Sequence, residues 1–147
     1  MPSGMDTRVQ LTGRVTAGLG KAGPATQLDW FRAAMRRLWG FEPATGTLNV
    51  IVEGDWRPMD RLLLNAGTVV VPPSPDVCCS IVLPARLEKG VRTVPVILFR
   101  PLVDGYNPAQ VELLSAICLR DALDLRDGDQ VRISAENRPP AVKWVAG

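Results

Sequence analysis

The glycine-rich segment Gly18-Leu19-Gly20-Lys21-Ala22-Gly23 is the first place in the chain where residue types and spacing suggest chemistry. Backbone N–H groups in such a turn form a concave anion site, and glycine lets the backbone approach a phosphate closely. Lys21 adds a positive charge to this segment. Because the same spacing also occurs in turns that bind nothing, the segment by itself leaves both interpretations open.

Thr47 and Asn49 alternate with the apolar residues Leu48, Val50 and Val52. Alternate residues of a strand lie on one face about 7 Å apart, so the hydroxyl of Thr47 and the amide oxygen of Asn49 can reach one cation. Mg²⁺ prefers such oxygen ligands and keeps several waters and substrate phosphates in its shell. The spacing alone fits equally well two polar side chains that satisfy local backbone groups.

The chain contains no histidine, which excludes mechanisms that need a histidine base or nucleophile. Among the carboxylates, Glu112 has apolar neighbours on both sides and can orient or deprotonate an attacking hydroxyl. An ordinary solvent-facing strand residue is the alternative interpretation. The segments around Asp104 and Asp127-Gly128-Asp129 are typical of turns, and the ring of Tyr106 can stack on a planar ligand.

Length and composition predict a single domain, with a core at residues 8–134 and tails at 1–7 and 135–147. The chain has 147 residues, and its 13 glycines and 13 prolines favour a loop-rich β fold over a helical bundle. A net charge of +2 gives no argument for a nucleic-acid or membrane partner. We expect a monomeric cytoplasmic protein without a signal peptide. Its three cysteines lack metal-ligand spacing and are expected to be reduced, partly buried thiols.

Hydrophobic periodicity predicts several short strands and one main helix, which together position these residues. The helix is expected at residues 26–38, where Leu28, Phe31, Met35 and Leu38 share a face and Gly40 ends it. Strands are expected at residues 8–15, 47–53, 68–71, 77–83, 93–100, 110–117 and 130–134, with a helical turn at 119–123. The predicted fold is a small six-stranded β-barrel.

Three blocks of the sequence resemble the archaeal CTP-dependent riboflavin kinase family. They are Gly13-x-Val15-x-x-Gly18-Leu19-Gly20-Lys21-Ala22, Gly40-Phe41-x-Pro43-x-x-Gly46-Thr47-Leu48-Asn49-Val50, and Val111-Glu112-Leu113 through Leu119-Arg120-x-x-Leu123-x-Leu125-x-Asp127-Gly128-Asp129-x-Val131. Their order and approximate spacing agree with the family from about Leu11 to Ile133. The resemblance implies a cradle-loop β-barrel that transfers the γ-phosphoryl group of CTP to the 5′-hydroxyl of riboflavin, giving FMN and CDP.

The resemblance also implies roles for individual residues. Thr47 and Asn49 would bind Mg²⁺, with Asn49 and Glu112 as the catalytic residues, and riboflavin would contact Glu112 and Asp104. The nucleotide would lie against the residues Gly18, Leu19, Gly20, Lys21, Ala22, Gly23, Ile117, Leu125, Arg126, Asp127 and Gly128. Asp104 stands where the family tends to carry threonine, and residues 54–90 match only loosely. A kinase for a different alcohol and a non-catalytic nucleotide- or flavin-binding module therefore stay as alternatives.

Overall fold

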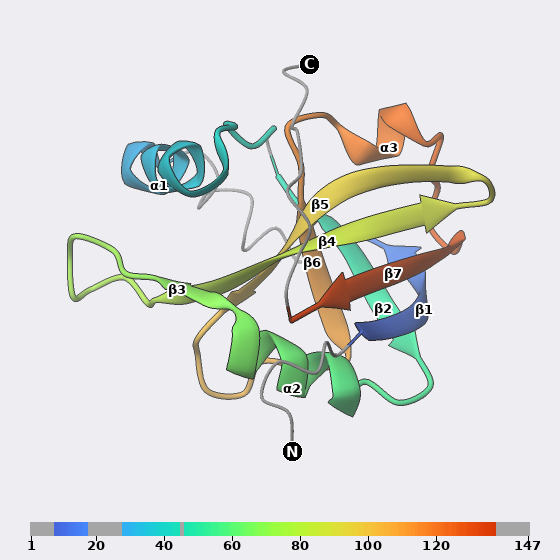
Figure 1. The fold of residues 1–147 in the computed structure, drawn as a ribbon, viewed down its shortest axis with the longest axis horizontal. Helices are drawn as coiled ribbons and strands as arrows, with labels where there is room; N and C mark the ends of the chain where they lie inside the picture. Colours follow the sequence, from blue (N-terminus) through green and yellow to red (C-terminus); the bar gives the residue numbers. More distant parts are fainter. Residues whose placement is uncertain (1–7, 18–27, 45, 138–147) are drawn as a thin grey trace.

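The computed structural model describes residues 8–17, 28–44 and 46–137, and its strands form one antiparallel sheet. The strand order is β3-β4-β5-β6-β2-β1-β7, and an additional pairing of β4 with β7 closes six strands into a barrel (Figure 1). The predicted six-stranded barrel is thus confirmed, and β3 is a further strand on the outer edge of β4. The strands are β1 (Arg8–Thr16), β2 (Leu48–Glu53), β3 (Thr68–Val70), β4 (Ser80–Lys89), β5 (Arg92–Pro101), β6 (Gln110–Leu114) and β7 (Gln130–Glu136).

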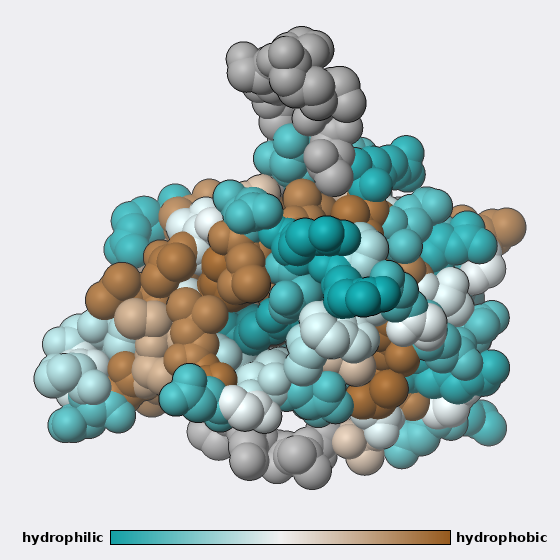
Figure 2. All heavy atoms as spheres, turned by 90° about the horizontal axis from the view of Figure 1, so that it is seen from below, coloured by the Kyte–Doolittle hydropathy of each residue, from teal (hydrophilic) through white to brown (hydrophobic). Residues whose placement is uncertain are grey.

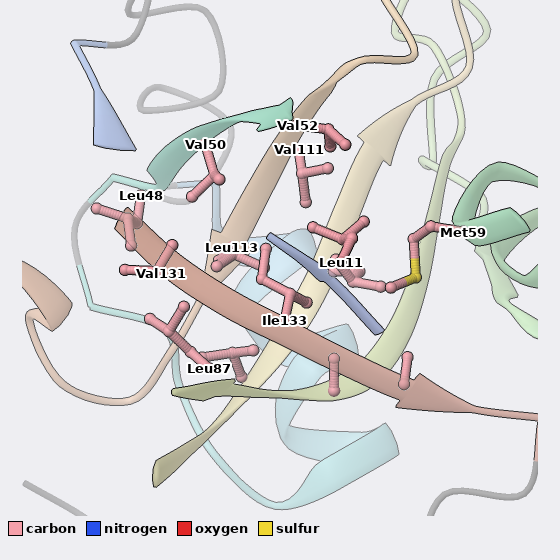
Figure 3. Close-up of a cluster of buried hydrophobic side chains, with 14 of the residues drawn as sticks. Leu11, Leu48, Val50, Val52, Met59, Leu87, Val111, Leu113, Val131 and Ile133 are labelled. Carbon is pink, nitrogen blue, oxygen red and sulfur yellow. The ribbon is translucent and has the colours of Figure 1, made fainter. Parts of the chain in front are cut away.

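The barrel interior is filled by apolar side chains from every strand of the closed ring (Figure 3). Leu48, Val50 and Val52 of β2 point inward together, as their alternation predicts, and none of them is more than 8% exposed. Burial of each such side chain stabilises the fold by roughly 1.5–3 kcal/mol relative to exposure. The opposite face of β2, which carries Asn49, therefore lies on the outside of the barrel.

Helix α1 (Asp29–Trp39) packs on the outside of the barrel and forms a second apolar cluster there (Figure 1). Phe31 contacts Phe99 of β5 edge to face, with ring centroids 5.5 Å apart. Phe31 and Met35 are fully buried as predicted, but Leu28 and Leu38 are each more than a third exposed. The buried stripe of the helix is therefore narrower than the sequence suggested. Gly40 ends α1 in the left-handed conformation, as predicted.

Helix α2 (Arg57–Ala66) was not predicted from the sequence pattern. Its buried residues Met59, Leu62 and Leu63 follow helical spacing and join the interior cluster at the lower end of the barrel (Figure 1). Pro58 lies in the first turn of the helix, where a proline costs no hydrogen bond. The short helix α3 (Leu119–Ala122) contributes Leu119 to the same interior cluster.

Several element boundaries differ from the prediction. Strand β4 begins at Ser80, so Cys78 and Cys79 precede the strand, and β6 ends at Leu114. Strand β7 continues to Glu136, two residues into the expected C-terminal tail, because it pairs with β1 as far as Arg8. Cys79 is partly buried, whereas Cys78 and Cys118 are exposed, and all three are free thiols.

The edge strand β3 leaves apolar side chains on the surface. Val69 and Val71 are at least half exposed, and so is Leu64 of α2. Figure 2 shows apolar residues gathered on the left of the lower face, the side toward which β3 projects in Figure 1. Across residues 8–17, 28–44 and 46–137, no helix combines the length and apolarity that crossing a bilayer requires.

Candidate active site

The register of four strands places a row of residues across the outer face of the barrel. Thr16 at the end of β1 pairs with Asn49 of β2, and Asn49 pairs with Glu112 of β6. Glu112 in turn lies opposite Phe99 of β5, which packs beneath α1. Opposed residues on neighbouring strands have Cβ atoms about 4.5–5.5 Å apart, so the side chains of Asn49 and Glu112 are direct neighbours.

Glu112 is buried, with 5% of its surface exposed, although it lies on the outer face of the barrel. The hydroxyl of Thr47 donates a hydrogen bond to its Oε1 at 3.2 Å, and the phenolic hydroxyl of Tyr106 donates to its Oε2. Burial raises the pKa of the Glu112 carboxyl, and these two hydrogen bonds partly oppose that rise. Burial also raises the pKa of Tyr106, and the Glu112 carboxylate adds to the increase, so the phenol stays protonated as a donor.

Asn49 is the second buried polar residue of this row, at 7% exposure. Its Oδ1 accepts a hydrogen bond from the side-chain amide of Gln110 at 3.3 Å, which orients the oxygen. Thr47 gives its only hydrogen to Glu112, which leaves the lone pairs of its hydroxyl oxygen for another partner. Thr47, Asn49 and Glu112 are thus an all-oxygen donor set, the type that suits a hard cation such as Mg²⁺.

A pocket of about 130 Å³ adjoins this row on the side of α3. Thr47 lines it together with Ser115, Ile117 and Arg120. Arg120 donates to the backbone carbonyl of Thr16 at 3.2 Å and to the carboxylate of Asp127 at 2.7 Å. The guanidinium therefore ties the end of β1 to the 126–129 turn, beside the pocket.

The same turn is also hydrogen-bonded to β1 through the backbone. The N–H of Gly128 donates to the carbonyl of Val15 at 2.7 Å, and the N–H of Val15 donates to the carbonyl of Asp129 at 2.9 Å. Arg14 adds a side-chain hydrogen bond to the Gly128 carbonyl at 2.9 Å. The 126–129 turn is therefore fixed beside the end of β1, which stops at Thr16.

The structure brings together some of the predicted site residues and separates others. Thr47, Asn49 and Glu112 meet, Ile117 lines the adjoining pocket, and Arg126, Asp127 and Gly128 are exposed on the nearby turn. Leu125 packs into the barrel interior, so its side chain supports the turn from inside. Asp104 is exposed at the turn preceding Tyr106. The predicted phosphate-binding segment, Gly18 to Gly23, lies outside the described residues.

Two residues at this site were not assigned a site role from the sequence. Arg120 occurs in the third motif, three positions after Ile117, and an arginine so near a predicted nucleotide-binding residue is a signal that was available. Tyr106 was expected only as a possible stacking surface, and its contact with Glu112 depends on how the 102–109 loop folds back. Sequence spacing carries no information about that contact.

Similarity to known proteins extends over most of the chain. A family model named CTP-dep_RFKase, with the description "Domain of unknown function DUF120", matches residues 15–135. A riboflavin kinase of Pyrobaculum arsenaticum is 31% identical over 138 residues, which are 85% of this chain and 60% of the relative. A riboflavin kinase of Methanobrevibacter smithii is 31% identical, over 85% of this chain and 98% of the relative. A riboflavin kinase of Sulfurisphaera tokodaii is 27% identical, over 88% of this chain and 97% of the relative.

Proposed function

The chain belongs to the DUF120 family, whose model is named for CTP-dependent riboflavin kinases, and we propose that it transfers the γ-phosphoryl group of CTP to the 5′-hydroxyl of riboflavin. The products are FMN and CDP. The observation that carries the proposal is the row Thr16, Asn49 and Glu112 across β1, β2 and β6. It holds the end of β1, the amide oxygen donor of Asn49 and the buried carboxylate of Glu112 on neighbouring strands.

Glu112 is suited to act on the acceptor alcohol. In an in-line transfer, the riboflavin hydroxyl oxygen bonds to the γ-phosphorus while the bond from phosphorus to the β,γ-bridging oxygen breaks, and CDP leaves. The hydroxyl proton passes to Glu112, whose carboxylate retains free lone pairs beyond those that Thr47 and Tyr106 occupy. Burial of Glu112 limits access of water, which would otherwise compete as acceptor.

Thr47 and Asn49 fit the cation that nucleotide-dependent transfer requires. Their hydroxyl and amide oxygens are neutral, so the phosphates of CTP supply the negative charge of the coordination shell. When bound, Mg²⁺ offsets charge on the transferring phosphoryl group. Within the described ranges, no group of three or more His, Cys, Asp and Glu side chains is placed to hold a metal.

The nucleotide side of the proposed site consists of the pocket and the turn beside β1. Arg120 lines the pocket and offers a charged donor, and backbone groups of Gly128 and Asp129 are hydrogen-bonded to Val15 near the end of β1. On the acceptor side, the loop that carries Tyr106 also exposes Leu102 and Val103 by more than 40% each. These apolar side chains suit the flat, apolar ring system of a flavin, and Asp104 suits its hydroxylated chain.

An end-point assay tests the proposal directly. The purified chain is incubated with riboflavin, Mg²⁺ and either CTP or ATP, and FMN is separated from riboflavin by chromatography. We expect FMN with CTP and little with ATP. A Glu112→Gln variant should be nearly inactive, while Glu53→Gln, a carboxylate on the same barrel outside the site, should match the wild type.

The absence of FMN with both nucleotides, from protein shown by circular dichroism to be folded, would refute riboflavin as the acceptor. CDP formation with another alcohol would then point to a kinase of different acceptor specificity. Ligand binding without any CDP formation would point to a non-catalytic module.

A further inference from the structure

The two oxygens of the Glu112 carboxylate have different hydrogen-bond partners, and one of these partners lies outside the three sequence motifs. Oε1 accepts from Thr47, which follows the Gly40–Gly46 segment and belongs to the proposed cation site. Oε2 accepts from Tyr106, which comes from the loop between β5 and β6. A carboxylate held at both oxygens has little freedom to rotate about its terminal bond.

Tyr106 is itself held by two further residues. The guanidinium of Arg100 lies over its ring, 5.8 Å from the ring centroid, in a cation–π arrangement. Arg100 also donates to Asp60 of α2, and both side chains of this ion pair are mostly buried, at 12% and 22% exposure. A partly buried, fixed guanidinium is a firmer support for the ring than a surface pair would be.

The backbone of the loop supports the same placement. The N–H of Leu102 donates to the carbonyl of Cys79 at 2.8 Å, which fixes the start of the loop. The side-chain oxygen of Asn107 accepts from the N–H of Ala109 at 3.0 Å, and the backbone carbonyl of Asn107 accepts from the N–H of Gln110 at 3.0 Å. These two hydrogen bonds fix the end of the loop. Gly105, at a φ of 81°, makes the bend that turns Tyr106 toward β6.

We propose that Tyr106 is a positioning residue for Glu112: its hydroxyl, supported by Arg100 and Asp60, aims the carboxylate at the acceptor hydroxyl. This inference rests on the proposed function. It assigns a task to helix α2 as well, because Asp60 lies at the far end of the same chain of contacts. The competing role for Tyr106 is a stacking platform that binds the flavin ring without acting through Glu112.

The contact can be tested without any activity measurement, because Tyr106 is the only tyrosine of the chain. Protein grown with tyrosine carrying an NMR-active carbon label at Cζ gives a single signal. We expect Glu112→Gln to shift that signal and Glu53→Gln to leave it in place. If the signal has the same chemical shift in Glu112→Gln as in the wild type, the inference is overturned, whatever reaction the protein catalyses.

The positioning role is then tested by kinetics on Tyr106→Phe, which keeps the ring over Arg100 and removes only the hydroxyl. Loss of one hydrogen bond to a charged group should lower kcat about tenfold, with KM for CTP and for riboflavin changed less than about twofold. An unchanged kcat would overturn the proposal. A raised KM for riboflavin with an unchanged kcat would also overturn it, in favour of the stacking role.

A matched pair of variants tests the support from α2. Asp60→Asn should lower kcat by roughly threefold to tenfold, because it weakens the hold on Arg100. Asp55→Asn, which breaks the exposed pair with Arg57 near the start of the same helix, should leave kcat within about twofold. Equal effects of the two substitutions would remove α2 from the proposal. A wild-type protein that makes no FMN would refute the proposed function, and the NMR result would still decide whether the contact exists.

Discussion

Thr47 donates its hydroxyl hydrogen to Oε1 of Glu112 at 3.2 Å, although 65 positions separate the two residues in the sequence. The antiparallel register of β2 and β6, in which Asn49 lies opposite Glu112, produces this contact. A slip of one residue would turn Glu112 into the apolar interior of the barrel. The register thus joins the proposed cation ligands to the proposed acceptor-aligning carboxylate.

Removal of the Thr47 hydroxyl should weaken the proposed cation site. In Thr47→Val, the Mg²⁺ concentration that gives half-maximal FMN formation should rise at least about tenfold, because one oxygen ligand is lost. Measuring initial rates over a Mg²⁺ series checks this. Thr93→Val, which removes an exposed hydroxyl from β5, is the matched control and should behave as the wild type. An unchanged Mg²⁺ dependence in Thr47→Val would contradict the assignment.

Arg120 should act on the nucleotide more than on the chemical step. We expect Arg120→Ala to raise KM for CTP about tenfold or more, since it removes a charged donor from the pocket and one of the contacts between the 126–129 turn and β1. Steady-state kinetics with CTP as the varied substrate measure the effect. The control is Arg61→Ala on α2, an exposed arginine at the opposite end of the barrel, and its KM should not change. A KM equal to the wild-type value would exclude Arg120 from the nucleotide site.

Gly13 should be required for stability rather than for catalysis. A Cβ atom at this position would lie 2.4 Å from Cγ1 of Val50 and 2.7 Å from the carbonyl oxygen of Ile51, so β1 and β2 would have to move apart. We expect Gly13→Ala to lower the free energy of unfolding by about 1–3 kcal/mol. Urea denaturation gives the value.

The neighbouring exposed residue Gln10 provides the control for Gly13. Gln10→Ala on the same strand should change the free energy of unfolding by no more than about 0.5 kcal/mol. If Gly13→Ala proves as stable as Gln10→Ala, then β1 and β2 do not approach each other as closely as the structure shows.

The sequence by itself determined the strands and the inner and outer faces of the barrel. Leu48, Val50 and Val52 recur at every second position, and a period of two leaves only one way to bury all three. The closed six-stranded barrel with one main helix was predicted from such patterns and was confirmed. The residues Thr47, Asn49 and Glu112 were named as candidates from the motifs, which local spacing and family resemblance can identify.

Only the tertiary structure decided how these elements meet. Helix α2 was missed because Arg57-Pro58 indicates a turn as readily as a helix start, and the barrel end that Met59 and Leu62 cover exists only in the folded chain. The burial of Glu112 could not be predicted either, because the apolar neighbours that flank it in sequence point away from it, into the barrel. Strand register places Thr47 beside Glu112, and the folded 102–109 loop places Tyr106 there. Those are long-range relationships, and no local pattern of residues encodes them.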